Sequence, residues 1–553
     1  MASRISLLLA PALVLAACGG DDAPPPTGLA RVTVTRYDYE VDLTTRAATA
    51  RVALTLVDPG NCVALASRNP GLDLATVTLG GAPATADSDG ATLTACGEGW
   101  VAGTQLELVA NLALEPATWA PSQVGFSITN DAAGQPLTYL LSWVGQCDRL
   151  LPCDPSPGVF ARFGFTVHHP AGTTVLCPGR VTAGADTTTC NFDQDGGPTY
   201  STLGVMASPS WQPTDLGDWG GVHATLYTRP ASGMAAAIDV PYHQAFLAWM
   251  RARFGPFPYG DELRVVTGPT YWAGFEHPGN IMLDERLARA TGSLYARPVG
   301  HTLNHELAHQ WAGDQTTLAG TYDFVWKESM AEYLSFAYEA DTEPATALRT
   351  ARAWKSFAVG AAYFPVPTAD PRPALLDYYG EVYGPGPMIL FRQIEALSSR
   401  EAVLAALATL LGHPRALSVD EVVAALEAST GLDLSTYASV WLRGAGAPAW
   451  PQFRLTVSGT APDQQLTVAE VTPGGVLHGC NFSVGITGAG GETGKVWIAR
   501  GVDGAATVTV PTGVTWAVTQ TQLDVDAQCL AYLAPAVAKV TRHPVGWTPW
   551  RVR

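Results

Sequence analysis

Two histidines and two glutamates in the second half of the chain have the types and spacing of a metal site. His305 and His309 are four residues apart, so a helix would project both imidazoles from one face, about one turn apart. Glu328 follows after an eighteen-residue gap and supplies a third ligand from a second helix. Two imidazoles and one carboxylate suit Zn²⁺, and three protein ligands leave a fourth position for water, as in catalytic zinc sites.

Glu306 lies beside the first histidine, at the rim of this predicted site. A carboxylate there can accept a proton from zinc-activated water, because the metal lowers the pKa of the water toward neutrality. His301 is a rival ligand, since it also lies four residues from His305. A pair of His301 and His305 would leave Glu306 and His309 without roles, so we assign His301 to packing or to contacts behind the ligands. The sequence therefore predicts one Zn²⁺ per chain, with a hydrolytic function.

The elements that must position these residues are predicted to be mainly helical. Leu307, Ala308 and Trp311 supply apolar positions around the histidines, as expected of a buried helix with one functional face. Helical periodicity also marks residues 242–254, 402–411 and 419–428. The flanking sequence has the alternation of strands, as at residues 32–43, 50–57 and 105–113 before the helices and 453–457, 465–468 and 496–498 after them.

The composition of the chain indicates how many domains it can form and which partners are disfavoured. With 553 residues, 47% hydrophobic and 15% charged, the chain is long and apolar enough for several packed domains. The net charge of -17 argues against nucleic acid or an anionic membrane surface as a partner, because phosphate groups attract basic patches. We expect a multidomain α+β protein. Its predicted parts are a signal peptide (1–17), a tether (18–29), an N-terminal β domain (30–225), a helical catalytic domain (226–448) and a C-terminal β-sandwich (449–553).

The amino terminus is typical of an export signal. Arg4 precedes a short apolar run that ends in Leu15-Ala16-Ala17-Cys18, which resembles a bacterial lipobox. The resemblance implies cleavage before Cys18 and lipidation of that cysteine. The protein would then be anchored in the bacterial cell envelope on an extracytoplasmic face, and it would contact the membrane through this lipid alone. The alternative is an ordinary secretory signal with an incidental cysteine.

The other cysteines agree with export. Nine cysteines without Cys18 leave eight, an even number that fits disulfides in an oxidising compartment. Sequence alone leaves the connectivity open. Pairing of neighbours along the chain would join 62 with 96, 147 with 153, 177 with 190, and 480 with 529.

The metal motif resembles that of the aminopeptidase N family of gluzincin zinc metallopeptidases. His305 to Trp311 and Gly313 match the family pattern, and Glu328 stands where the family has its third ligand. Upstream, Ala273 to Ile281 resembles the family's Gly-x-Met-Glu-Asn exopeptidase motif. Leu151 to Pro155 is similar to a Pro-Cys-x-Asp-Glu-Pro segment of its β domain. The resemblance covers residues 30–450 and implies a thermolysin-like zincin fold for the catalytic domain.

Several roles follow from this resemblance. Glu276 would bind the free amino group of a peptide, and Tyr383 would donate a hydrogen bond to the oxyanion that forms during hydrolysis. Alternatives remain: Glu276 as a solvated loop carboxylate, or one of the neighbouring tyrosines 378 and 379 in place of Tyr383. Apart from the resemblance, Glu332 lies four residues after Glu328 on the expected helix, so it would orient a ligand imidazole from behind unless it lies on a solvated helix face.

The sequence also departs from the family pattern. Leu141, Ser142 and Trp143 stand where the family usually has a Gln or Glu that helps to hold the amine. Phe275 replaces a methionine and would narrow the pocket for the first side chain, and His277 replaces an asparagine. The large C-terminal helical domain of many relatives would be absent, which would leave an open cleft.

Three functions are compatible with these residues. The leading hypothesis is an extracytoplasmic zinc aminopeptidase that acts on peptides. The same zinc ligands would serve a gluzincin endopeptidase, and a catalytically inactive zinc-binding surface lipoprotein is the third possibility. The oligomeric state is left open.

Overall fold

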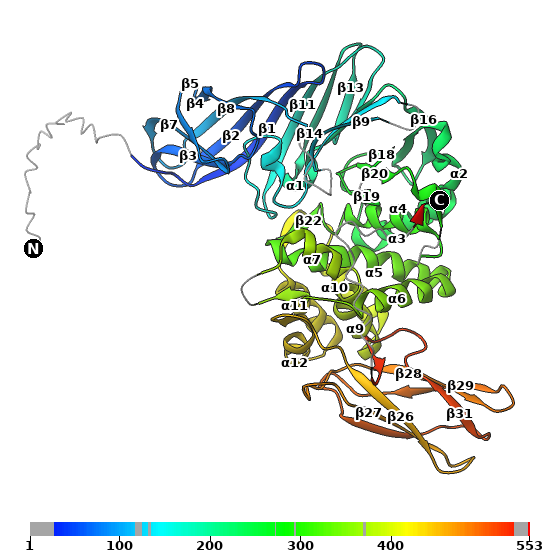
Figure 1. Ribbon diagram of the computed structural model, residues 1–553. Helices are drawn as coiled ribbons and strands as arrows, with labels where there is room; N and C mark the ends of the chain where they lie inside the picture. The colour runs from blue at the N-terminus through cyan, green and yellow to red at the C-terminus, as the bar shows by residue number, and fades with distance from the viewer. Residues whose placement is uncertain are drawn as a thin grey trace, which may run out of the picture.

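The computed structural model describes residues 27–116, 124–130, 134–270, 272–291, 295–368, 372–535 and 551–552. The predicted signal peptide, Cys18 and most of the predicted tether lie outside these residues. Figure 1 shows a β-rich N-terminal region, a helical middle region and a pair of C-terminal sheets that follow one another along the molecule. The protein is thus a mixed α+β protein, in agreement with the sequence prediction.

The largest sheet of the N-terminal region has eight strands in the order β13-β14-β11-β1-β2-β8-β4-β5. In β1, Val34 is buried, and after a bulge near Arg36 the buried positions continue at Tyr37, Tyr39 and Val41. The extra residue changes the phase of the alternation without turning the apolar face away from the core. The strands are β1 (Val32–Asp42), β2 (Ala47–Leu56), β4 (Leu72–Leu79), β5 (Ala82–Pro83), β8 (Gln105–Ala113), β11 (Phe160–His168), β13 (Arg180–Ala183) and β14 (Thr187–Pro198).

Two smaller sheets complete this region. The first has three strands, β3 (Gly60–Ala66), β6 (Thr85–Ser88) and β7 (Thr92–Trp100). The second has four, β9 (Gly125–Asn130), β10 (Pro136–Leu141), β12 (Thr174–Leu176) and β15 (Gly204–Ser208).

A short helix, α1 (Thr199–Thr202), joins β14 to β15 and contacts the middle region. The Tyr200 hydroxyl donates to the Gly313 carbonyl at 2.7 Å, and the Ser201 hydroxyl donates to Asp314 at 2.6 Å. Both contacts are buried. The N-terminal region is therefore attached to the turn that directly follows His309.

Within the described residues, four disulfides join neighbouring cysteines: Cys62–Cys96, Cys147–Cys153, Cys177–Cys190 and Cys480–Cys529. The pairing of neighbours expected from the sequence is confirmed. Four such bonds suggest an oxidising, extracytoplasmic compartment.

The middle region contains a five-stranded sheet in the order β16-β17-β18-β20-β19. Its strands are β16 (Gln212–Asp218), β17 (His223–Thr228), β18 (Glu262–Gly268), β19 (Gly274–Phe275) and β20 (Asn280–Asp284). β17, β18 and β20 are parallel, and the two edge strands, β16 and β19, are antiparallel to their neighbours. The domain boundary predicted after residue 225 falls inside β17, because the β16–β17 hairpin pairs with the sheet of the middle region.

The middle region also contains a series of helices (Figure 1). They are α2 (Met234–Ala237), α3 (Val240–Phe254), α4 (Pro298–His309), α5 (Phe324–Thr342), α6 (Pro344–Ala358), α7 (Leu375–Val382), α8 (Pro385–Pro387), α9 (Gln393–Leu397), α10 (Arg400–Leu410), α11 (Val419–Thr430) and α12 (Ser435–Tyr437). Local signals set several starts: α4 begins with proline, and Ser418 and Glu421 form a capping box on α11. α5 is buried from Phe324 through Glu339, so it runs through the core.

The C-terminal region has two sheets. One contains β26 (Gln452–Ser458), β27 (Gln465–Glu470), β30 (Thr507–Pro511) and β32 (Tyr532–Leu533), and the other contains β28 (Phe482–Gly488), β29 (Thr493–Ile498) and β31 (Val518–Gln522). The rings of Phe453 and Phe482, one from each sheet, have centroids 5.2 Å apart. The inner faces of the two sheets therefore contact each other.

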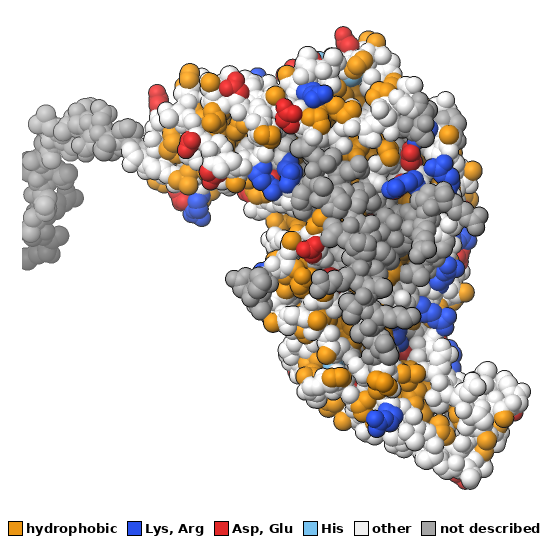
Figure 2. All heavy atoms as spheres, in the orientation of Figure 1, with side chains coloured by type: hydrophobic (Ala, Val, Ile, Leu, Met, Phe, Trp, Pro, Cys, Tyr) orange, Lys and Arg blue, Asp and Glu red, His pale blue; other side chains and the backbone are white. Residues whose placement is uncertain are grey.

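Three pairs of short strands connect distant segments: β21 (Ala290–Thr291) with β33 (Arg551–Val552), β22 (Thr316–Leu318) with β24 (Arg415–Leu417), and β23 (Val366–Pro367) with β25 (Arg443–Gly444). In the part of the chain that the structure describes, each helix is too short or too polar to cross a membrane. On the face seen in Figure 2, apolar side chains are interspersed with charged ones over the N-terminal region.

Candidate active site

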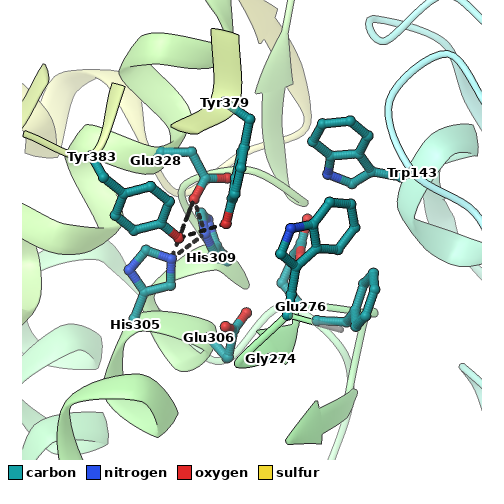
Figure 3. A pocket seen from close by; sticks show the side chains of 11 residues that line it. Trp143, Gly274, Glu276, His305, Glu306, His309, Glu328, Tyr379 and Tyr383 are labelled. Atoms are coloured by element: carbon teal, nitrogen blue, oxygen red, sulfur yellow. Dashed lines mark hydrogen bonds and ion pairs between the residues drawn. The ribbon is translucent and has the colours of Figure 1, made fainter. Parts of the chain in front are cut away.

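The predicted metal ligands come together where α4 and α5 meet (Figure 3). His305 Nε2 and His309 Nε2 are 2.9 Å apart, and Glu328 Oε2 lies 3.4 Å from the first and 3.7 Å from the second. One ligand atom from each residue lies within 4.8 Å of the others. The last two turns of α4 carry the histidines and the second turn of α5 carries Glu328, so two rigid elements hold the group.

The contacts behind the two imidazoles fit a metal. His309 Nδ1 lies 2.9 Å from the Ala312 carbonyl, so this nitrogen donates and the lone pair remains on Nε2. His305 Nδ1 lies 3.2 Å from Glu332 Oε1, which favours the same tautomer. Both Nε2 lone pairs and one carboxylate oxygen then face a common point. This set of donors suits Zn²⁺.

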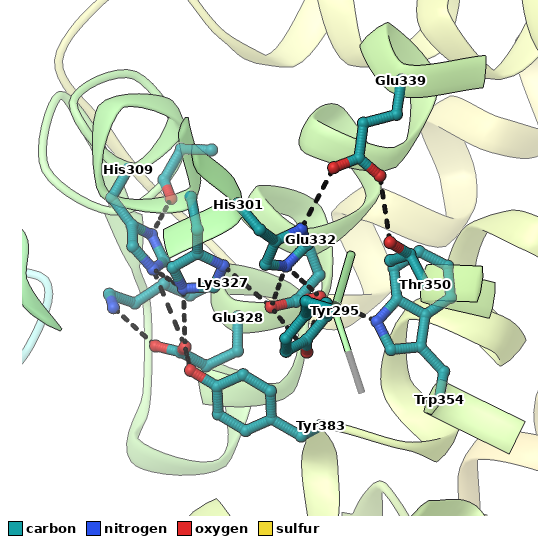
Figure 4. A network of polar contacts seen from close by, with 12 residues as sticks. Tyr295, His301, His309, Lys327, Glu328, Glu332, Glu339, Thr350, Trp354 and Tyr383 are labelled. Carbon is teal, nitrogen blue, oxygen red and sulfur yellow. Dashed lines mark hydrogen bonds and ion pairs between the residues drawn. The ribbon is translucent and has the colours of Figure 1, made fainter. Parts of the chain in front are cut away.

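Glu332 and His301 belong to a buried network behind His305 (Figure 4). Glu332 accepts a hydrogen bond from Trp354 Nε1 at 2.7 Å and lies 3.2 Å from His301 Nε2. Only 2% of Glu332 is exposed, so it does not lie on a solvated face. Although burial opposes it, the charge of His301 holds the pKa of Glu332 well below its usual range.

His301 contacts acidic groups rather than the common point of the ligands. Its Nδ1 lies 3.4 Å from Glu339 Oε1, and the Tyr295 ring stacks on it with centroids 3.8 Å apart. Burial lowers the pKa of His301, but Glu332 and Glu339 outweigh burial and raise it to about 9. The residue is thus a cation that balances the carboxylates behind the ligands.

Glu306 lines the same pocket and is 5% exposed. Burial raises its pKa from 4.5 to about 8. Gly274 on β19 packs directly against it: a Cβ at Gly274 would lie 2.3 Å from Glu306 Oε1. A side chain at this position would therefore displace the carboxylate of Glu306.

Two tyrosines reach the pocket from α7 and its end. The Tyr383 hydroxyl donates to Glu328 Oε2 at 3.1 Å, and the Tyr379 and Tyr383 hydroxyls are 2.8 Å apart. Tyr378 lies elsewhere and donates to the Pro365 carbonyl. Burial raises the pKa of Tyr383 well above its ordinary value, so the hydroxyl keeps its proton. On sequence alone Tyr379 is an alternative to Tyr383, and the structure brings both residues to the pocket.

Glu276 lines the pocket close to Glu306 and is 8% exposed. Its Oε1 lies 2.9 Å from Lys327 Nζ, and the same ammonium lies 2.7 Å from Glu328 Oε1. Burial alone would raise the pKa of Glu276, but the charge of Lys327 lowers it below its ordinary value. Sequence reasoning missed Lys327, because no local pattern links it to Glu276.

Aromatic rings line the side of the pocket away from the ligands (Figure 3). Trp143, which follows β10, and Trp272 have centroids 4.9 Å apart, and Trp272 and Phe275 are 5.2 Å apart. Trp143 thus lies in the pocket where the family resemblance led us to look for a polar side chain. His277 is turned away, and its Nδ1 donates to the Ser201 carbonyl at 2.6 Å.

The pocket as a whole combines acidic, imidazole and aromatic groups. It is lined by Trp143, Trp272, Gly274, Phe275, Glu276, His305, Glu306, His309, Glu328, Tyr379 and Tyr383. This arrangement can bind a metal, move a proton and hold an apolar group beside a cationic one.

Comparison with known proteins agrees with this geometry. Residues 242–365 match the model of the peptidase family M1 domain, and this segment includes α4 and α5 with the three candidate ligands. Aminopeptidase N of Streptomyces lividans is 26% identical over 320 residues, which is 52% of this chain and 36% of that relative. The chain therefore spans about a third of the length of the relative it matches. The segment of residues 242–365, which carries the candidate ligands, thus matches peptidase family M1, and the chain is distantly homologous to aminopeptidase N.

Proposed function

We propose that this protein is an extracytoplasmic zinc aminopeptidase that removes N-terminal residues from peptides. The observation that carries the proposal is the position of Glu276, whose carboxylate lines the same pocket as Glu306 and the group of His305, His309 and Glu328. A buried carboxylate beside the hydrolytic groups can bind a peptide's terminal ammonium by a charge-assisted hydrogen bond. This would place the first peptide bond, rather than an internal one, at the reacting groups.

His305, His309 and Glu328 are the residues that would hold the metal. When bound, Zn²⁺ would polarise the scissile carbonyl and make water a stronger nucleophile. Glu306 would accept the proton of the attacking water and pass it to the leaving amine. Burial raises the pKa of Glu306 to about 8, and a bound cation would lower it toward the range in which a carboxylate acts as a base at neutral pH.

Tyr383 would stabilise the negative charge that develops on the former carbonyl oxygen. Because burial keeps its hydroxyl protonated, it can donate a hydrogen bond, and the neighbouring Tyr379 hydroxyl supports its orientation. Loss of one such donor commonly slows turnover about a hundred- to thousand-fold.

An endopeptidase is the second candidate, and one observation favours it: the charge of Glu276 is already paired with Lys327. A noncatalytic zinc-binding protein is the third, and the presence of both Glu306 and Tyr383 in the pocket argues against it. We also propose that the protein is held at the cell envelope by a lipid on Cys18, which a Cys18→Ser variant would test by its release into the soluble fraction.

Hydrolysis of fluorogenic aminoacyl amides, each beside its N-acetylated form, tests the three functions. An aminopeptidase cleaves the free-amine substrates much faster, loses this preference in Glu276→Ala and loses activity in Glu306→Gln. Equal cleavage of both forms would support the endopeptidase. No cleavage of either form by fully zinc-loaded protein would support the noncatalytic protein.

A further inference from the structure

Lys327 is a buried cation between two carboxylates that have different proposed roles. Its side chain is 1% exposed, and its Nζ contacts Glu276 Oε1 at 2.9 Å and Glu328 Oε1 at 2.7 Å. Lys327 follows Trp326 and precedes Glu328 on α5, whereas Glu276 lies just after β19. The ammonium therefore links the candidate amine-binding residue to a candidate metal ligand.

The contact with Lys327 separates the two carboxylate oxygens of Glu328. Lys327 contacts Oε1 of Glu328, and Oε2 of the same residue faces His305 Nε2 and His309 Nε2. Glu276 also lines the pocket, whereas Lys327 is not among the described residues that line it. A substrate would therefore meet Glu276 from the pocket, while Lys327 lies behind this carboxylate.

A cation in this place changes how the pocket distinguishes the ends of peptides. A free terminal ammonium is attracted by Glu276 and repelled by Lys327, whereas an acylated, neutral terminus is affected little by either charge. The effect is strong because both groups are buried, where solvent screens charges poorly. Lys327 thus reduces the advantage that Glu276 gives to the free amine.

We propose that Lys327 is a positioning residue that sets the selectivity for free amino termini, lowering it by neutralising Glu276 from behind. The inference rests on the proposed aminopeptidase function and extends it to a substrate class: peptides with neutral or blocked amino termini are rejected less strongly than an unpaired Glu276 would reject them.

The test compares Lys327→Gln and Lys327→Met with the wild type and with Lys327→Arg, which keeps the charge. The measured quantity is the ratio of kcat/KM for phenylalanyl aminomethylcoumarin to that for its N-acetylated form. We expect the ratio to rise about tenfold, or ~1.4 kcal/mol, in both neutral variants and to stay near the wild-type value in Lys327→Arg. The change should fall mainly on KM for the free amine, because the ammonium is equally charged in the bound and transition states.

A second measurement is independent of turnover. Calorimetry on zinc-loaded Glu306→Gln, with and without Lys327→Gln, compares the binding of phenylalaninamide with that of N-acetylphenylalaninamide. The preference for the free amine should again increase when Lys327 is neutralised. Lys355→Gln is the matched control, since Lys355 also pairs with a buried carboxylate, that of Asp524. Its substitution should leave both ratios unchanged.

The outcomes separate this inference from the proposed function. If the wild type cleaves no free-amine substrate faster than its acetylated form, the aminopeptidase proposal fails. If it does, but the neutral variants keep or lower the ratio, only the role of Lys327 is overturned. Failure of both neutral variants to fold would assign Lys327 to stability and would also overturn it.

Discussion

Two groups of buried charges, one in the C-terminal sheets and one at the pocket, show how differently a protein can use the same side chains. In the C-terminal region, Glu470 contacts Arg500 and His478, and the side chains of Glu470 and Arg500 are fully buried. Arg500 also donates to the carbonyls of His478 at 2.6 Å and Ala505 at 2.8 Å. The charges of this group are satisfied within one region.

The group at the pocket is not closed in this way. His305, His309 and Glu328 direct donor atoms at one common point, and Glu276 and Glu306 face the same cavity. Burial of charge is common to both groups, so it does not by itself identify a functional site. Convergence of donor atoms on a place that a ligand can reach distinguishes the pocket from the C-terminal group.

Removal of the metal should have the largest effect on activity. It should affect the charged group at the pocket and leave the C-terminal group unchanged. Treatment with a chelator is expected to lower hydrolysis more than about a thousandfold, because carbonyl polarisation and water activation are lost together. Activity should return when Zn²⁺ is added back, as measured with a fluorogenic aminoacyl amide. Full activity in protein shown to be metal-free would contradict the assignment of the pocket residues to a functional metal site.

Glu470→Gln should lower the stability of the protein and leave its activity unchanged. It leaves Arg500 buried beside a neutral group, so we expect the free energy of unfolding to fall by ~3–5 kcal/mol. Denaturant melts measure this change, and kcat/KM per folded molecule should equal that of the wild type. A loss of activity without a loss of stability would mean that the C-terminal group acts on the site.

Gly274→Ala should damage the pocket without unfolding the protein. The added methyl group would lie 2.3 Å from Glu306 Oε1, so the carboxylate must move. A displaced base of this kind commonly costs about a hundredfold in turnover. Steady-state kinetics and zinc content measure the two effects, and zinc should be retained. Gly380→Ala is the control, because a Cβ there meets nothing within 4 Å.

His243 differs from both groups of buried charges, because it is a buried titratable residue that stays neutral. Its substitution should have the smallest effect. Burial lowers its pKa from 6.5 to about 4, even though its Nδ1 contacts Asn304 Oδ1 at 2.7 Å. Between these two pH values the unfolded chain binds a proton that the folded protein does not, so stability falls as pH falls, by ~2 kcal/mol at pH 5. His243→Gln should remove this part of the pH dependence of unfolding. An unchanged profile would contradict a neutral, buried His243.

The sequence predicted features that depend on neighbours along the chain. The spacing of His305 and His309 specifies one helix face, and α10 and α11 lie within two residues of the predicted segments. All four disulfides join adjacent cysteines.

Contacts between distant segments were harder to predict. Lys327 reaches Glu276 only after α5 packs near β19, and the β16–β17 hairpin joins its sheet through pairing with β18. Such contacts depend on how elements pack against one another, and no periodicity within either segment encodes them.

The attachment of α1 to the turn after His309 disfavours recombination that would replace one region of this protein and keep the other. Tyr200 and Ser201, which belong to the β-rich region, hold Gly313 and Asp314 next to the end of α4. A recombination that gave the helical region a different β domain would therefore lose two buried hydrogen bonds at the base of the site. The two regions are inherited most easily as one unit.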